Sequence, residues 1–179
     1  MKKLFTCISV VIILVTGLNG CAQLIFPKRD NLINLKTNTN SISGIYKNMP
    51  SDSSEVTLWY LLSHQDGDDT LYTTNAENLS VQLIVQNQYS LIAKLFDENS
   101  LIAQKKVNGK IQGDYFSVRR KIKYIGLPLI YMKESDWKLQ IAKTKNGNLH
   151  IDGAFFSVKN IFIISGGFDY TVNCLYAPK

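Results

Sequence analysis

The sequence has little cysteine and little histidine, with three and two residues respectively among 179. Zinc sites in proteins use clusters of these side chains at short, regular spacings. The two histidines, His64 and His150, lie far apart, and neither has a cysteine close to it in the chain. We therefore expect no metal and no cofactor.

Sequence motifs of catalysis are also missing. There is no Gly-x-Ser-x-Gly stretch that would expose a nucleophilic serine, and no glycine-rich loop that would cradle a phosphate. Cys174 alternates with aromatic residues in a strand-like segment, which predicts a buried thiol and not a reactive one. His150 lies between Leu149 and Ile151, so we expect it on the opposite face of a strand, toward solvent. The chain is therefore expected not to be an enzyme.

Long hydrophobic runs are limited to the N-terminus. Lys2 and Lys3 precede an uncharged apolar run over residues 4–18, and the small residue Gly20 follows. This is the three-part layout of a secretory signal peptide. The run is shorter than the about 20 apolar residues of a membrane-spanning helix. The alternative to a cleaved signal is an N-terminal anchor that is never cut.

The end of this run, Leu18-Asn19-Gly20-Cys21, resembles the lipobox of bacterial lipoproteins. The resemblance implies that residues 1–20 are removed and that Cys21 is lipidated, so that the membrane is a partner through the N-terminal lipid. Several acyl chains on one residue would give stable anchoring. Ala22, in place of an aspartate, implies sorting to the outer membrane of the bacterial cell envelope, facing the periplasm.

The mature chain is expected to have two parts, a lipidated tether over residues 21–40 and a single domain over residues 41–179. Only Cys174 would remain as a thiol, which excludes an intramolecular disulfide. The sequence has 20 basic and 14 acidic residues, and a net charge of +6. This modest excess is compatible with an anionic ligand. We expect no nucleic acid partner.

The rest of the sequence predicts a mainly β fold. Apolar and polar residues alternate over many short segments, and turn residues such as those at 145–148 separate them. We expect an up-and-down antiparallel sheet of roughly eight strands, which could close into a barrel. An open curved sheet or a two-sheet sandwich is the alternative. One short helix is expected over residues 52–63, with Asp52 and Glu55 as its capping pair.

A short segment at the start of the domain supports the barrel. Gly44-Ile45-Tyr46 resembles the Gly-x-Trp that opens lipocalin-like barrels, with Tyr46 in the place of the tryptophan. The resemblance implies a cavity that holds a lipid or another hydrophobic small molecule. The predicted helix would then either close one end of the barrel or pack on its outside.

The densest positive charge lies between positions 105 and 123. Simple alternation places Arg119, Lys121 and Lys123 on one face with Tyr115 and Ser117. This trio could contact lipid phosphates or another anionic polymer, or it could be a solvated strand face. Arg120 falls among apolar residues, where it needs a partner. That partner could be a buried carboxylate or the acidic group of a ligand.

Two functions are consistent with these sequence features. The first is a lipid-anchored carrier that binds a hydrophobic or anionic small ligand in a cavity lined by Arg120, Trp137 and Phe155. The second is an interaction module, such as an inhibitor or immunity-type protein, that binds another envelope protein. A cavity lined by those three residues would favour the carrier. A filled core with an exposed apolar patch would favour the interaction module.

Overall fold

The computed structural model describes residues 29, 31–52, 55–63, 77–119, 121–127, 130–162 and 164–179. The expected lipidation site Cys21 and the expected ligand residue Arg120 lie outside these ranges, and of Lys121 only the backbone is described. Within the described residues, no helix is long and apolar enough to cross a membrane.

The fold is mainly β, as predicted, and the described strands form one antiparallel sheet. The strand order is β1-β2-β3-β4-β5-β7-β8-β9, and β6 also pairs with β7. The strands are β1 (Gly44–Lys47), β2 (Leu79–Asn87), β3 (Ser90–Asp97), β4 (Ser100–Gln112), β5 (Tyr115–Val118), β6 (Lys121–Leu127), β7 (Tyr131–Lys143), β8 (Leu149–Ile161) and β9 (Ile164–Tyr176). A 3-10 helix, η1 (Thr39–Ile42), and an α-helix, α2 (Leu58–Ser63), complete the described elements.

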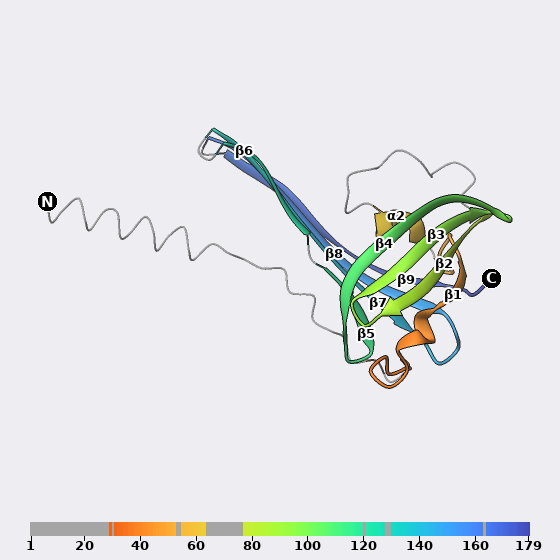
Figure 1. The fold of residues 1–179 in the computed structure, drawn as a ribbon. Coiled ribbons are helices and arrows are strands. Elements are labelled where there is room, and N and C mark those ends of the chain that lie inside the picture. Colours follow the sequence, from red (N-terminus) through yellow and green to blue (C-terminus); the bar gives the residue numbers. More distant parts are fainter. Residues whose placement is uncertain are drawn as a thin grey trace, which may run out of the picture.

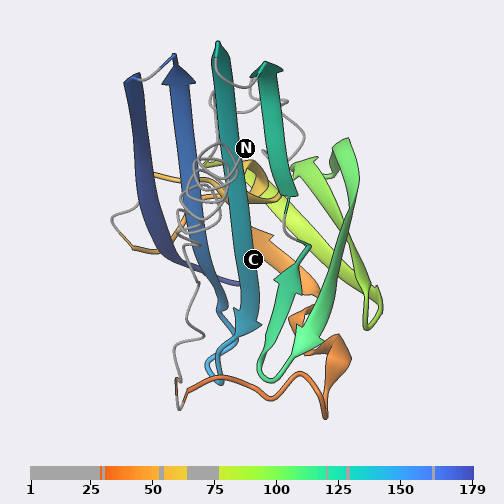
Figure 2. The same cartoon turned by 90° about the vertical axis from the view of Figure 1, so that its left-hand side faces the viewer.

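The molecule has a compact body and a long projection (Figure 1). We call the projection the arm; it comprises residues 122–127, 131–136, 156–161 and 164–169. Figure 2 shows its four strands side by side, with β6 and β9 as the two edges. The three long strands continue from the body into the arm without a break in register. Two successive hairpins therefore carry one sheet well beyond the core.

The core lies on the concave side of the curved sheet in the body. Alternate residues of β7 and β8, such as Leu139, Ile141 and Ile151, are buried there. Helix α2 adds Leu58 and Leu61 to the same core, which is the packing role considered for the predicted helix. Burial of these apolar side chains is the main source of stability in a domain without disulfides.

The helix is shorter than predicted, and its N-terminus is built differently. It begins at Leu58, where the side chain of Asn48 accepts a hydrogen bond from the Trp59 amide (2.9 Å). Thr57 Oγ1 accepts a second one from Tyr60 (3.2 Å). The predicted capping role of Asp52 is wrong, because its carboxylate accepts a hydrogen bond from the Leu175 amide of β9 instead.

The sheet does not close into the predicted barrel. Its two ends, β1 and β9, meet only through the residues after β9: Tyr46 forms an isolated bridge with Pro178, and the Lys47 amide donates to the Ala177 carbonyl (2.9 Å). Among the described residues, no strand pairs with the outer edge of β9 along the arm. The curved open sheet named as the alternative is therefore the observed form.

Buried tyrosines make the fold sensitive to alkali. Burial raises the pKa of Tyr46 to about 12 from 10.0, and its hydroxyl donates to the Ile42 carbonyl (3.0 Å). The unfolded chain loses this proton near pH 10, whereas the folded chain keeps it until about pH 12. The free energy of unfolding should therefore be unaffected below pH 10 and fall by about 2–3 kcal/mol as the pH rises to 12.

Urea unfolding on both sides of this pH window measures the effect. Tyr46→Phe is the control, and it should show a smaller alkaline loss, although it also loses about 1 kcal/mol at neutral pH with its hydrogen bond. An equal alkaline loss in both proteins would contradict a role for Tyr46. Burial also raises the pKa of Tyr176, so part of the loss should persist in the variant.

Candidate functional site

A change of register between β5 and β6 decides which side chains lie on which face of the arm. Phe116 of β5 pairs with Ile141 of β7, and Lys121 of β6 pairs with Trp137. The chain from Phe116 to Lys121 is one residue longer than the stretch of β7 beside it. An extra residue of this kind inverts the alternation of every residue that follows. Odd-numbered residues of β6 therefore face the same way as the core residues of β7.

This finding corrects the expected basic face. Tyr115 and Ser117 lie on the side of the sheet that faces away from the core, whereas Lys123 lies on the side continuous with it. Arg119 is exposed and borders a hollow of about 410 Å³ on the body, together with Lys110. The side chain of Lys105 instead binds the Ser63 carbonyl at the end of α2 (2.9 Å). The basic residues between positions 105 and 123 thus serve separate surfaces.

We call the face of the arm that continues the core side the inner face. Two rows of laterally paired residues cross it. Lys123, Ser135, Ser157 and Phe168 form one row, and Ile125, Lys133, Lys159 and Gly166 form the next row toward the tip. Lys133 and Lys159 are direct cross-strand partners, and such like-charged pairs are unfavourable. None of the described residues on this face is acidic.

The acidic residues of the arm lie on its outer face. Asp136 is buried there beside Lys138 (3.8 Å), and Glu134 accepts a hydrogen bond from the Tyr124 hydroxyl (3.3 Å). Among the described residues, no ion pair reaches Lys123, Lys133 or Lys159. The two faces of the arm therefore differ in charge, and the positive charge of the inner face is not neutralised by the described part of the protein.

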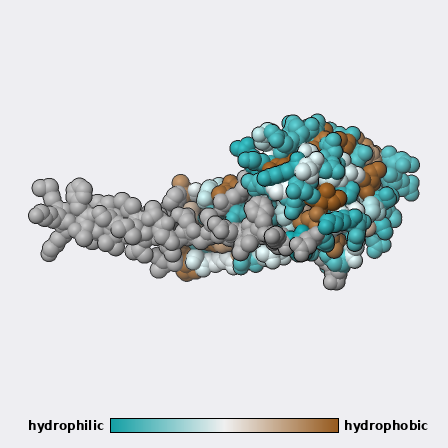
Figure 3. All heavy atoms as spheres, turned by 90° about the horizontal axis from the view of Figure 1, so that it is seen from below, coloured by the Kyte–Doolittle hydropathy of each residue, from teal (hydrophilic) through white to brown (hydrophobic). Residues whose placement is uncertain are grey.

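The tip of the arm is apolar and exposed. Its last paired row consists of Leu127, Tyr131, Ile161 and Ile164, and Ile130 and Phe162 belong to the two hairpin ends. Leu127, Phe162 and Ile164 are 67%, 70% and 73% exposed. The Phe162 amide donates to the Ile130 carbonyl (3.0 Å), which joins the two hairpin ends. Hydrophobic residues also reach the surface along the arm in Figure 3.

Phe162 has an unusual backbone conformation for a bulky residue. Its φ angle is +53°, in the left-handed region that favours glycine and asparagine. Two-residue hairpin turns need such angles, which is why Asn-Gly is common in them. A phenylalanine here costs about 1 kcal/mol in backbone strain, and it exposes a large apolar side chain. Stability alone therefore does not account for this residue.

A groove of about 360 Å³ lies on the inner face near the tip. Gly166 leaves its floor open, because a Cβ atom built there would meet nothing within 4 Å. Its lining combines one cation with apolar side chains and small residues: Ser157, Lys159, Ile161, Ile164, Gly166, Gly167 and Phe168. The groove therefore offers a positive charge beside an apolar surface.

A series of aromatic rings connects the core with this groove. Trp137 contacts Phe155, Phe155 stacks on Tyr170 with 4.6 Å between ring centroids, and Tyr170 stacks on Phe168 (6.1 Å). Trp137 and Phe155 are buried in the core, at 8% and 4% exposed. These two expected ligand residues therefore lie in packed protein, in the same cross-strand row as Tyr170. The groove begins where the series reaches the surface.

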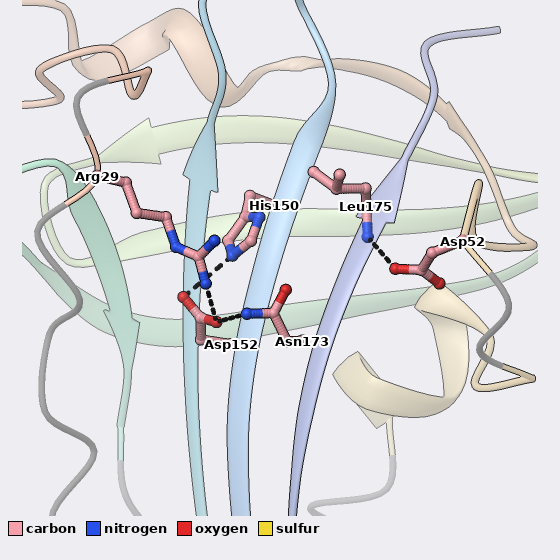
Figure 4. A network of polar contacts seen from close by, with 6 residues as sticks. All are labelled: Arg29, Asp52, His150, Asp152, Asn173 and Leu175. Carbon is pink, nitrogen blue, oxygen red and sulfur yellow. Dashed lines mark hydrogen bonds and ion pairs between the residues drawn. The ribbon is translucent and has the colours of Figure 1, made fainter.

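A second cluster of polar residues lies on the opposite side of the sheet, in the body (Figure 4). The carboxylate of Asp152 accepts a hydrogen bond from Asn173 of β9 (2.9 Å) and forms an ion pair with Arg29 (3.4 Å). His150 Nε2 lies 3.1 Å from the other carboxylate oxygen. We call these four residues the Asp152 cluster. They fasten Arg29 to β8 and β9.

Contacts close to the Asp152 cluster also hold the N-terminal segment against the sheet. The Ile33 amide donates to the Lys143 carbonyl (2.9 Å), and Leu32 packs with Tyr115 and Ala142. Burial and the charge of Asp152 raise the pKa of Tyr115. Leu32 and Leu35, in the second half of the expected tether, are buried. The Asp152 cluster is therefore a clamp between the N-terminal segment and the sheet.

The prediction that His150 faces solvent is wrong. Its side chain is on the predicted face of β8, but it is 2% exposed because the N-terminal segment covers that face. The alternation of His150, Asp152 and Ala154 in the sequence marks the face, but Arg29, which covers it, lies 123 residues earlier than Asp152. No local pattern could indicate this contact.

The inner face of the arm is thus the better candidate for a functional site. It combines exposed apolar side chains, unneutralised lysines and a groove, which suit non-covalent binding of an amphiphile. In the described part of the chain, no three His, Cys, Asp or Glu side chains come together as they would around a metal ion. Comparison with protein-family models, curated proteins and solved structures finds no match for this chain.

Proposed function

We propose that the protein is a lipid-anchored binding protein of the bacterial envelope, which binds an amphiphilic lipid through the inner face of its arm. The observation that carries the proposal is the groove beside the Lys133–Lys159 pair. A lysine pair without acidic neighbours is a suitable site for a phosphate or carboxylate group. The apolar lining and the exposed ring of Phe168 are suited to acyl chains.

This proposal keeps the carrier hypothesis but moves its site. Trp137 and Phe155 lie one row further toward the core than Ser157 and Phe168, which line the groove. The anchoring at Cys21 and the envelope location are part of the same proposal, and they rest on the lipobox resemblance. The binding requires no covalent chemistry.

A protein partner is the second candidate. The core is filled at Trp137 and Phe155, and an apolar patch is exposed, which is the pattern that favours an interaction module. Among the described strands, β9 is the last in the sheet, and its residues 164–171 are exposed. An edge of this length can accept a strand from another chain.

Photo-crosslinking in cells separates these two candidates. A benzophenone amino acid replaces Phe168 on the inner face, or Thr171 on the outer face as the matched control, in the full-length chain. We expect Phe168 to give a product heavier by one lipid and Thr171 to give none. Gly166→Phe should abolish this product by filling the groove, since a Cβ atom at this position meets nothing within 4 Å. A crosslink from Phe168 to a protein, with no lipid product, would contradict the lipid proposal and support the interaction module.

A further inference from the structure

We propose that the tip of the arm inserts into a bilayer of anionic phospholipids, as a second membrane contact independent of the N-terminal lipid. The inference concerns the end of the arm and does not require a lipid in the groove. Five large apolar side chains are more than half exposed there: Leu127, Ile130, Ile161, Phe162 and Ile164.

The charge pattern behind the tip fits a membrane surface. Lys133 and Lys159 lie two residues behind the last paired row, which corresponds to about 7 Å along a strand. Interfacial segments bury their apolar side chains about 5–10 Å below the lipid headgroups. With the tip at this depth, both lysines reach the level of the phosphates. Lys123 lies in the next row and adds to the same positive surface.

The apolar end of the arm also carries a tyrosine. Tyr131 belongs to the last paired row and is 37% exposed. Tyrosines are enriched where a protein crosses from lipid headgroups into hydrocarbon, because their rings are apolar and their hydroxyls are polar. Apolar and tyrosine side chains at the end of the arm, with lysines behind them, follow the order that a bilayer surface presents.

The same pattern limits the depth of insertion. Glu134 and Asp136 lie on the outer face directly behind the tip, and charged groups are costly inside hydrocarbon. Some backbone polar groups at the hairpin ends are already hydrogen-bonded within the protein, because the Phe162 amide donates to the Ile130 carbonyl. Such internal pairing is what apolar surroundings require of a backbone. The tip is therefore suited to shallow insertion and not to spanning.

The strained turn provides independent support. Phe162 keeps a bulky apolar side chain at a φ of +53°, where asparagine would be less strained. A membrane contact explains this choice, because a phenylalanine ring gains from leaving water. Replacing Phe162 should therefore weaken membrane binding without lowering the stability of the fold. A purely structural role would predict a loss of stability instead.

The experiment uses full-length lipidated protein in vesicles, with an environment-sensitive fluorophore on a new cysteine. Ser165→Cys places the label next to the tip, and Asn146→Cys places it in the turn at the opposite end of β7 and β8. Both positions are exposed, whereas the native Cys174 is buried. Vesicles contain phosphatidylcholine alone or with phosphatidylglycerol. Spin-labelled lipids, which quench the fluorophore, are placed either in the vesicles that carry the anchored protein or only in separate acceptor vesicles.

We expect the label at position 165 to shift to the blue and to be quenched by spin-labelled lipids, but only when phosphatidylglycerol is present. Position 146 should show neither effect. Each lysine near an anionic surface contributes about a fivefold change in affinity, so Lys133→Ser with Lys159→Ser should lower insertion about thirtyfold. Quenching from the anchored membrane or from acceptor vesicles would support the proposal equally, and would show which bilayer the tip enters.

Two variants keep the test specific. Phe162→Asn should weaken insertion while the melting temperature stays equal or rises, and Gly166→Phe should not weaken insertion although it blocks the groove. A label at position 165 that stays in water on anionic vesicles would overturn the proposal. A blue shift that follows protein density on neutral vesicles would overturn it too, because it would indicate contact between copies of the chain.

Discussion

Asp152→Ala is expected to lower the free energy of unfolding by about 2–4 kcal/mol, because it leaves the partly buried Arg29 guanidinium without its anion and the Asn173 side-chain amide without its acceptor. Asp152 is 5% exposed and is the common partner of Arg29, Asn173 and His150. For a chain of this size, the loss corresponds to a melting temperature lower by about 4–16 °C. Thermal and urea unfolding measure it directly.

The variant should also release the N-terminal segment before the body unfolds. Arg29 is a trypsin site whose side chain is held by Asp152 in the folded protein. Limited proteolysis should therefore cut Asp152→Ala after Arg29 much faster than the wild type. Asp169→Ala is the matched control, since Asp169 is exposed on β9 and its loss should change stability by about 0.5 kcal/mol or less. Equal stability of the two variants would show that the Asp152 cluster is not a clamp.

Phe155→Ala is expected to destabilise the fold by about 3–5 kcal/mol, the usual cost of removing a buried aromatic ring. The ring is 4% exposed, and it packs between Trp137 and Tyr170. Chemical unfolding of the purified variant measures the loss. A wall residue of an open ligand cavity would instead tolerate truncation with little change in stability and with loss of the ligand.

Phe168→Ala is the matched control for this prediction. Phe168 belongs to the same aromatic series but is 60% exposed, so its truncation should cost less than about 1 kcal/mol. The bound lipid, in contrast, should be lost from Phe168→Ala. If Phe155→Ala folds as stably as wild type and loses the lipid, then the site lies inside the body and not on the arm.

The fold class could be predicted because alternation and turn residues act locally. Leu139 and Ile141, or Leu149 and Ile151, alternate with polar residues as strands with one buried face do. The turn after Thr144 is predicted from Asn146 and Gly147, and Gly147 has the positive φ of 90° that such a turn needs. These signals do not depend on distant parts of the chain.

The arm could not be predicted, because its edge strands β6 and β9 are exposed on both faces. A strand that lacks a buried face need not alternate regularly, as in β6, where the apolar residues Tyr124 and Ile125 are adjacent. The change of alternation between β5 and β6 is also invisible in the sequence, because it depends on the register against β7. Lipidation of Cys21 remains a prediction, since that residue lies outside the described ranges.

The clamp at Arg29 has a consequence for the proposed anchoring. Arg29 follows Cys21 by only eight positions, so a fully extended chain between them spans at most about 29 Å. A tether that ended at residue 40 would have allowed a much greater distance. With the lipid in a membrane, the body must therefore stay close to that membrane, and the outer side of the sheet around Asp152 is nearest to the anchor.

The extra residue between β5 and β6 also determines how the arm can change during evolution. Deleting one residue between Val118 and Lys121 would restore simple alternation with β7. Lys123 would then turn to the outer face, and Ile122 and Tyr124 would turn to the inner face. A single deletion could therefore exchange the two surfaces of β6 while the hydrogen bonding of the strand persists. Lineages of this protein that differ in length at this point should differ in the polarity of the arm.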